Sequence, residues 1–174
     1  EGMDKIAVIS KNRPEWIILD LAVQQIGAVL TPIYPTISIN ELEFILNDAM
    51  VKLVFVNDED LYCKVLSIKE KVPSLQQIFT FEQVNDAKNW KGVMHEVSIE
   101  SLNKIKLIAE KIQATDLATI IYTSGTTGTP TGVMLSHQNI LSNVMASIPC
   151  FPPGENLIAL SFLPLNHIVE RMVT

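Results

Sequence analysis

Short apolar runs alternate with longer amphipathic stretches along most of the chain. Continuous apolar runs of strand length occupy residues 5–10 (KIAVIS), 28–33 and 52–56, and such runs are typical of buried strands. Residues 77–81 and 117–122 predict two further strands of the same kind. Because helical stretches separate these runs, the pattern predicts an α/β fold, a layered sandwich with a largely parallel sheet.

The intervening stretches carry helix signals. Residues 13–26 are apolar nearly all round, which predicts a helix buried on more than one side, with Asn12 as its N-cap. Ser38 and Glu41 have the spacing of a capping box ahead of apolar residues at helical intervals. Further helices are expected at 59–71, 99–112, 137–148 and from His167 onward.

Three remaining stretches complete the expected organisation. Residues 82–98 are polar and poorly patterned, which indicates a surface connection, and residues 157–162 predict another strand. Residues 133–135 are a candidate strand that returns along the strand before it. No repeat or linker divides the 174 residues. The first strand begins almost at once and the last helix has barely begun when the chain stops, so we expect truncation at both ends.

Composition and charge narrow the classes of function. Apolar residues make up 48% of the chain and charged residues 18%, as in a folded globular protein. The mean hydropathy of +0.27 suggests that further chain covers some apolar surface. The net charge is −6 without a basic patch, which argues against nucleic-acid binding. No Lys or Arg lies between Lys111 and Arg171, so an anion bound there would need backbone N–H groups and hydroxyls.

The cysteines and the apolar runs give no sign of export or membrane insertion. Cys63 and Cys150 fit no metal or redox spacing, so we expect both to be buried thiols. No signal peptide is visible. The longest apolar run, residues 16–30, is interrupted by polar residues and does not predict a membrane span. A cytoplasmic protein is the expectation.

The stretch from Tyr122 to Val133 (YTSGTTGTPTGV) carries the chemistry. Its glycines permit positive φ and a close approach to a ligand, so successive N–H groups can face an anion. Hydroxyls of five residues add donors, namely Thr123, Ser124, Thr126, Thr127 and Thr129. The spacing matches neither the Walker loop nor the dinucleotide and nucleophile-elbow motifs. Two interpretations stay open: a cradle for nucleotide phosphates, or a Gly/Thr-rich surface hairpin.

The same stretch closely resembles the phosphate-binding motif of the adenylate-forming superfamily, which includes acyl-CoA synthetases, luciferases and peptide-synthetase adenylation domains. The family pattern is Tyr-Thr-Ser-Gly-Thr-Thr-Gly-x-Pro-Lys-Gly-Val, and order and spacing agree over essentially the whole chain. The resemblance implies that nucleotide phosphates are bound by Thr123, Ser124, Gly125, Thr126, Thr127, Gly128 and Thr131. It also implies a magnesium contact of Thr123.

One position departs from that pattern. Thr131 stands where the family has lysine, so this loop can donate a hydrogen bond there but supplies no positive charge. Losing a charge-assisted bond to a phosphate costs about 1–3 kcal/mol. We therefore expect weaker phosphate binding than in relatives with lysine.

A second signature spans residues 160–172 (LSFLPLNHIVERM) and is most similar to long-chain fatty acyl-CoA synthetases. The resemblance implies that His167 lines the acyl and adenylate pocket; the alternative is a helix-start histidine satisfied by nearby backbone. Asn166 departs mildly from the serine or alanine common in relatives. Glu170 and Arg171 are adjacent and point about 100° apart on a helix, so we expect each to pair with another element.

These resemblances imply a two-step ligase that joins a fatty acid to coenzyme A with Mg²⁺ and ATP. Residues 1–174 would be part of an N-terminal AMP-binding domain, with the catalytic C-terminal domain absent and the 174 residues inactive alone. A lipid substrate is compatible with peripheral contact at the inner face of the membrane. Two alternatives are an amino-acid adenylation domain and a non-catalytic nucleotide-binding or interaction module.

Overall fold

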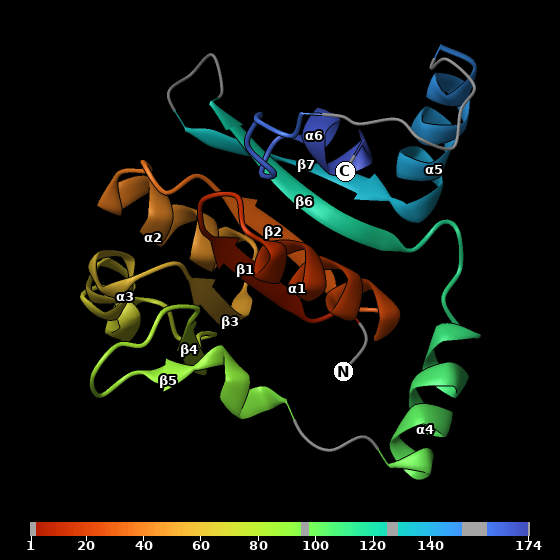
Figure 1. The fold of residues 1–174 in the computed structure, drawn as a ribbon. Coiled ribbons are helices and arrows are strands. Elements are labelled where there is room, and N and C mark those ends of the chain that lie inside the picture. Colours follow the sequence, from red (N-terminus) through yellow and green to blue (C-terminus); the bar gives the residue numbers. More distant parts are fainter. Residues whose placement is uncertain (1–2, 95–97, 125–128, 151–159, 174) are drawn as a thin grey trace.

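The computed structural model describes residues 3–94, 98–124, 129–150 and 160–173, and one β-sheet lies at its centre (Figure 1). Among these residues, seven strands lie in the order β5-β4-β3-β1-β2-β6-β7. The strands are β1 (Lys5–Ile9), β2 (Val29–Ile33), β3 (Val51–Val56), β4 (Gln77–Thr80), β5 (Lys88–Asn89), β6 (Leu117–Ser124) and β7 (Pro130–Ser136). All neighbouring pairs are parallel except β6 with β7, which confirms the predicted α/β fold with a largely parallel sheet.

The helices lie between the strands much as the pattern predicts. They are α1 (Pro14–Gln25), α2 (Ile39–Asp48), α3 (Glu59–Leu66), α4 (Ile99–Ala109), α5 (His137–Ser147) and α6 (Ile168–Val173), with short 3₁₀ turns at Lys69–Lys71, Trp90–Val93 and Ile148–Cys150. The strand expected at 157–162 is wrong for residues 160–162, which are irregular, and residues 157–159 lie outside the described residues. The expected surface connection at 82–98 includes the short strand β5.

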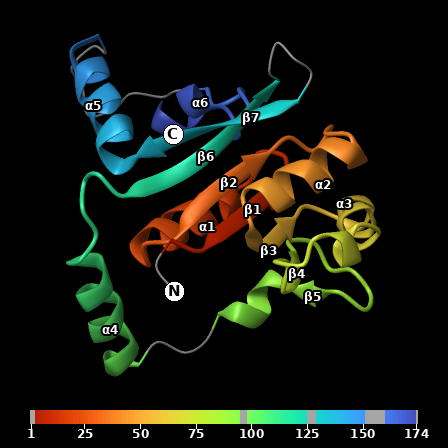
Figure 2. The ribbon, with the colours of Figure 1, turned by 180° about the vertical axis from the view of Figure 1, so that it is seen from behind.

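Helices cover both faces of the sheet and enclose two apolar cores (Figures 1 and 2). On one face α1 packs against alternate residues of the central strands, a core that includes Ile6, Val8, Trp16, Val23, Leu30 and Leu165. On the other face α2 and α3 cover the opposite set, including Ala7, Ile9, Val29, Leu42, Leu46 and Val65. Most residues of both cores come from the chain between β1 and β4. Because each fully buried side chain of this size contributes roughly 1.5–3 kcal/mol, this region supplies most of the apolar stabilisation.

The capping box at the start of α2 is confirmed. The side chain of Ser38 accepts the backbone N–H of Glu41 at 3.3 Å, and the Glu41 carboxylate accepts the backbone N–H of Ser38 at 3.2 Å. The Ser38 hydroxyl also donates to Oε2 of Glu41. This hydrogen bond, and then the one from the Ser38 backbone N–H, lower the pKa of the Glu41 carboxyl. The local sequence thus fixes where α2 begins.

Two expectations for α1 are wrong. Its N-cap is Arg13, without a side-chain cap hydrogen bond, while Asn12 turns its side chain to a distant segment of the chain. The helix is also buried on one side only, because Ile18 and Leu21 are 52% and 57% exposed. Among the buried residues of α1 is Asp20, a carboxylate in an otherwise apolar face.

The segments α4, β7 and α5 are packed more sparsely. No residue of α4 or α5 is buried, and Figure 1 shows α4 standing to one side of the sheet. The expectation of buried thiols is wrong, since Cys63 and Cys150 are both exposed. None of the helices in the described ranges has the length and apolarity needed to cross a membrane.

Candidate functional site

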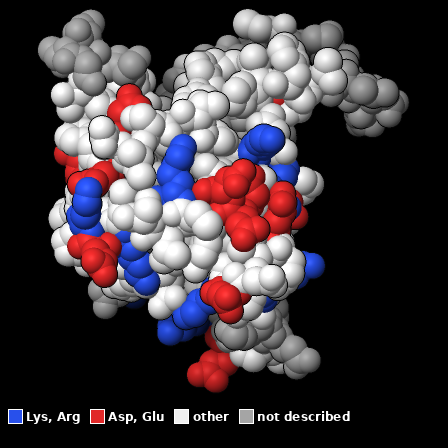
Figure 3. Space-filling view, turned by 90° about the vertical axis from the view of Figure 1, so that its left-hand side faces the viewer, with Lys and Arg blue, Asp and Glu red and all other residues white. Residues whose placement is uncertain are grey.

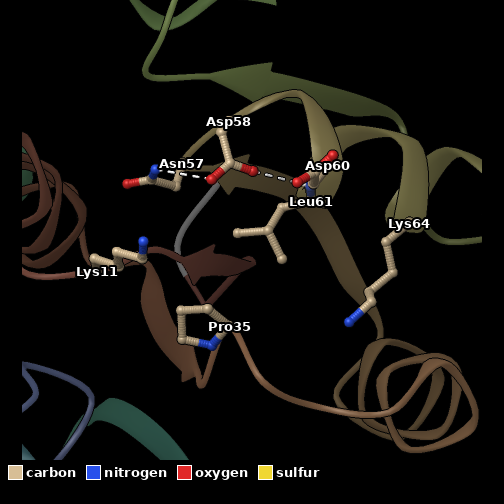
Figure 4. A pocket seen from close by; sticks show the side chains of 7 residues that line it. All are labelled: Lys11, Pro35, Asn57, Asp58, Asp60, Leu61 and Lys64. Atoms are coloured by element: carbon tan, nitrogen blue, oxygen red, sulfur yellow. Dashed lines mark hydrogen bonds between the residues drawn. The ribbon is translucent and has the colours of Figure 1, made fainter.

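The carboxyl ends of the parallel strands gather at one edge of the sheet, on the left in Figure 1. Open α/β sheets hold their ligands at this edge, where neighbouring connections diverge to opposite faces. A pocket of about 220 Å³ opens there, at the ends of β1, β2 and β3. Figure 4 shows the residues that line it: Lys11, Pro35, Asn57, Asp58, Asp60, Leu61 and Lys64. Its two lysines and two aspartates give it mixed charge.

Charge is unevenly distributed over this edge. Figure 3 looks at the left-hand side of Figure 1; acidic and basic side chains crowd the lower part, and the part near β6 and β7 is almost uncharged. The sequence explains the contrast, because residues 112–170 contain no Lys or Arg. An anion bound near the β6–β7 hairpin would therefore meet hydroxyls and backbone N–H groups.

The glycine- and threonine-rich stretch follows β6 at this edge and returns as β7. The two strands are antiparallel, with Tyr122 opposite Gly132 and Thr123 opposite Thr131. The hairpin proposed from the sequence is therefore present, and the returning strand is confirmed. Gly125, Thr126, Thr127 and Gly128 lie outside the described residues, and Ser124 is described only as part of β6. A hairpin does not exclude a phosphate cradle, since the candidate loop lies at its tip.

Thr123 and Thr131 form an exposed pair of hydroxyl residues at the base of that tip. Side chains alternate across a strand, and Ile120 and Tyr122 pack against the core that α2 and α3 cover. Thr123 and Thr131 are therefore on the opposite face, the one that α1 covers. Both can donate a hydrogen bond to a phosphate oxygen, but neither carries charge.

Tyr122 joins the hairpin to α2. Its hydroxyl donates to Asp48 Oδ2 at 2.5 Å. Burial, and then the hydrogen bond to the Asp48 carboxylate, raise the pKa of the Tyr122 hydroxyl, so the ring stays neutral and donates. The tyrosine therefore ties the last turn of α2 to the strand that leads into the loop.

Gly132 must be small because Tyr122 lies across it. A Cβ placed on Gly132 would lie 3.0 Å from Cγ2 of Ile120 and 3.1 Å from Cζ of Tyr122. Both distances are shorter than ordinary van der Waals contacts, so a larger residue would push the tyrosine ring away. The motif's tyrosine and last glycine thus form one packed unit below the loop.

A second pocket, of about 270 Å³, lies beside this unit. It runs from the end of β2 along α2 to the start of the loop, and it is lined by Pro32, Ile33, Tyr34, Thr36, Ile37, Glu41, Ile45, Tyr122, Thr123 and Pro130. Thr123 thus stands at the boundary between the hairpin and a cavity that a ligand could enter.

His167 lies in the turn that opens α6. Its backbone N–H donates to the carbonyl oxygen of Pro164 at 2.8 Å, and its Nδ1 accepts the backbone N–H of Val169 at 3.3 Å. A nitrogen that accepts carries no proton, so a neutral ring holds its proton on Nε2. The side chain is exposed, and Nε2–H is available to a ligand.

Residues of α1 hold this turn in place. Arg171 donates from Nε to Oδ2 of Asp20 at 2.6 Å and from Nη2 to Oδ1, which confirms that Arg171 pairs with another element. Trp16 Nε1 donates to Oδ1 of Asn166 at 3.2 Å. Sequence reasoning missed Trp16 and Asp20, although a carboxylate in an apolar helix was a signal that could have found Asp20.

The turn and the threonine pair share one side of the sheet. Leu165 is buried in the same core as Trp16 of α1, and Asn12 binds the turn just beyond the carboxyl end of β1. Thr123 and Thr131 project from the α1-covered face at the same carboxyl edge. The structure therefore brings Thr123 and Thr131 of the first signature and the turn of the second signature to one edge and one face of the sheet.

A complete metal site is not found in the described part of the chain. No group of three or more His, Cys, Asp or Glu residues there could hold an ion. Mg²⁺ prefers oxygen ligands and keeps several waters, so the exposed hydroxyl of Thr123 fits as a single ligand.

Residues 1–174 match the family of AMP-binding enzymes. The chain belongs to the AMP-binding enzyme family. This member is 31% identical to long-chain-fatty-acid–CoA ligase 5 of Mus musculus, over 97% of its own length and 26% of that protein. It is also 31% identical to the long-chain-fatty-acid–CoA ligase FadD15 of Mycobacterium bovis, over 98% of its length and 29% of that protein.

A solved structure agrees with the fold of this AMP-binding enzyme. ATP-bound MatB from Rhodopseudomonas palustris superimposes with a TM-score of 0.70 at 27% identity, over 99% of this chain and 32% of that one. The chain thus spans about a quarter of the length of the curated relatives it matches.

Proposed function

We propose that this chain supplies the phosphate-binding side of a site that activates a long-chain fatty acid with ATP and then transfers it to coenzyme A. The observation that carries the proposal is the hairpin: its base sets Thr123 opposite Thr131 at the carboxyl edge of the sheet, within a motif of the adenylate-forming family. Relatives named as long-chain-fatty-acid–CoA ligases support the reaction class.

The first step transfers the adenylyl group. A carboxylate oxygen of the fatty acid attacks the α-phosphorus of ATP, the bond to the β-phosphate oxygen breaks, and pyrophosphate leaves with the electron pair. The protein's contribution to such a step is positioning and stabilisation of charge. The hairpin loop, with Thr123, Ser124, Gly125, Thr126, Thr127, Gly128 and Thr131, would hold the outer phosphates.

Mg²⁺ would neutralise charge on the phosphates, and Thr123 is the residue of this chain that would contact it. In the second step the thiol of coenzyme A attacks the acyl carbonyl carbon, AMP leaves and a thioester forms. His167 would line the acyl and adenylate pocket, with Nε2–H turned to the substrate.

The turn from Leu163 to Arg171 supports a fatty acid as the substrate. Its sequence is most similar to long-chain fatty acyl-CoA synthetases, and the neighbouring exposed side chains Leu160 and Phe162 are apolar, 83% and 71% exposed. An apolar surface of this kind suits an alkyl chain better than the ammonium group of an amino acid.

We further propose that residues 1–174 form part of a larger N-terminal AMP-binding domain and make no acyl-CoA alone. The chain corresponds to about a quarter of each curated relative. Adenine binding, the acidic magnesium ligand and the catalytic lysine of the family are expected elsewhere in the full-length protein.

The test is pyrophosphate release from ATP by the full-length protein with a panel of carboxylates. We expect release with long-chain fatty acids and none with amino acids. Release with amino acids alone would favour a peptide-synthetase type of adenylation domain. No release with any carboxylate, together with measurable ATP binding, would favour a non-catalytic nucleotide-binding module.

A further inference from the structure

We propose that Asp20 is a positioning residue: through Arg171, and together with Trp16, it fixes the turn that carries His167 and so sets recognition of the carboxylate substrate. The inference deepens the proposed function and rests on it for the role of His167. Its geometric part, that α1 holds the turn, concerns only described residues and can be tested separately.

The ion pair between Asp20 and Arg171 is the strongest of these contacts. The guanidinium and the carboxylate meet through two parallel hydrogen bonds, and the two side chains are only 9% and 5% exposed. Such a bidentate pair fixes direction as well as distance. Nη1 of Arg171 has no acceptor among the described residues, so the orientation of the guanidinium is set from Asp20.

Trp16 forms a second point of attachment one helical turn earlier on α1. Its Nε1 donates to Asn166, the residue directly before His167, and both side chains are buried. The Arg171 guanidinium carbon lies 5.9 Å from the centroid of the Trp16 ring. One tryptophan therefore contacts the turn on both sides of His167.

Asn12 forms a third point of attachment, just ahead of α1. Its side chain donates to the carbonyl oxygen of Leu163 at 2.7 Å and accepts the backbone N–H of Leu165 at 2.9 Å. The Asn12 amide thus donates to and accepts from the backbone of the turn, as a neighbouring strand would, and so holds the turn in place. The side chain expected to cap α1 thus serves the candidate site.

The ion pair of Asp20 with Arg171 is expected to fix the orientation of α6 more than to stabilise the fold. A buried ion pair contributes little net stability, because the cost of desolvation offsets the Coulomb attraction, and apolar replacements are often neutral. What a bidentate pair does provide is a unique geometry. In α6, a helix of six residues, one such contact fixes the rotation of the helix and hence the direction of His167.

The experiment compares four variants of the full-length protein with the wild type. Asp20→Asn removes the charge at nearly constant volume, and Arg171→Lys keeps the charge but loses the bidentate geometry. Asp20→Asn leaves the Arg171 charge buried without its partner and could unfold the protein. The double variant Asp20→Leu with Arg171→Met leaves no unpaired buried charge, so it is expected to retain the fold. The matched control is Glu43→Gln, which breaks the solvent-exposed pair of Glu43 with Lys71 at 3.2 Å.

Two readouts separate positioning from stability. Hydrogen exchange of peptides covering residues 163–171 reports docking of the turn without any need for activity. We expect ~tenfold faster exchange there in the double variant at an unchanged unfolding temperature. We also expect KM for the fatty acid to rise ~tenfold, the equivalent of one charge-assisted contact, with KM for ATP unchanged. Arg171→Lys should be intermediate and Glu43→Gln like the wild type.

Failure of the positioning role of Asp20 and failure of the proposed function give different results. Wild-type exchange and wild-type KM in the double variant would overturn the inference, because the pair would then serve stability alone. Equal increases in both KM values would also overturn it. If the wild type releases no pyrophosphate with any carboxylate, the proposed function fails, and hydrogen exchange of residues 163–171 still decides whether Asp20 fixes the turn.

Discussion

The two parts of the candidate site are held in place by different means. The β6–β7 hairpin is held by its own backbone, with paired residues from Leu117 to Ser136. The turn from Leu163 to Arg171 is irregular until α6 begins, and it is held by the side chain of Asn12 and by side chains of α1, about 150 residues away in sequence. The hairpin is therefore shaped mainly by the pairing of its own two strands, with the Tyr122–Asp48 hydrogen bond as a distant support, whereas the turn depends on distant side chains.

This difference has a consequence for the effects of substitution. A hairpin held by main-chain hydrogen bonds can change surface side chains such as Thr131 without losing its shape. A turn held by side chains loses its shape when a single partner is changed. We therefore expect substitutions in α1 to disturb the turn and leave the hairpin intact.

The largest expected effect is that of Trp16→Ala, which breaks the support of the turn. Trp16 is 1% exposed, and removal of a buried tryptophan costs about 3–5 kcal/mol. The free energy of unfolding, measured in denaturant on the full-length protein, should fall by that amount. Ile18→Ala on the exposed side of the same helix is the control, with a change within about 0.5 kcal/mol; equal effects would contradict the account.

Thr131→Lys sharpens the comparison by adding charge to the hairpin alone. A charge-assisted contact of about 1.5–3 kcal/mol corresponds to roughly ten- to hundredfold tighter ATP binding or faster adenylation. Single-turnover adenylate formation against ATP concentration measures both, and the gain should shrink in high salt. Met134→Lys adds the same charge to the opposite face of β7 and should change neither; equal behaviour of the two variants would be inconsistent with a phosphate at Thr131.

Gly132→Ala tests the packed unit below the loop. The new Cβ would press on Ile120 and Tyr122, and overpacking of this kind costs about 1–3 kcal/mol. Thermal unfolding should show the loss. Gly92→Ala is the matched control, since no atom lies within 4 Å of a Cβ built there; if the two variants unfold alike, the tyrosine does not constrain position 132.

Tyr122→Phe should have the smallest effect. The lost hydrogen bond to Asp48 corresponds to about 0.5–1.5 kcal/mol. The folded-state pKa of Tyr122 is raised, so its contribution to stability is fully present below the unfolded tyrosine pKa of about 10 and is lost as the pH rises above that value. Denaturant unfolding from pH 8 to 11 should show this alkaline loss reduced in the variant; identical pH profiles would contradict the assignment.

Local patterns in the sequence predicted most of the fold. The apolar runs at 28–33 and 52–56 are buried strands, and the Ser38–Glu41 capping box starts α2 where expected. The failures have a tertiary cause. Asn12 binds a segment that only the fold brings near. The apolar sequence of α1 predicted burial on more than one side, but no described segment covers Ile18 and Leu21.

The candidate site divides in the same way. The motif residues Thr123, Thr131 and His167 could be named from the sequence, because their neighbours in the chain form the signature. Their supports could not, since Asp48, Trp16 and Asp20 lie outside both signatures and meet them through contacts far apart in sequence. Periodicity finds faces of helices and strands, but it does not show which distant polar groups pair across them.

Transfer of an isotopic label tests the central claim most directly. If the fatty acid carboxylate attacks the α-phosphorus of ATP, one carboxylate oxygen stays on that phosphorus when the thiol of coenzyme A displaces AMP. The measurement uses full-length protein, fatty acid with ¹⁸O in its carboxylate, ATP, Mg²⁺ and coenzyme A, with mass analysis of the nucleotide. The account predicts AMP that carries one ¹⁸O atom. Unlabelled AMP, or ADP with labelled phosphate, would contradict it.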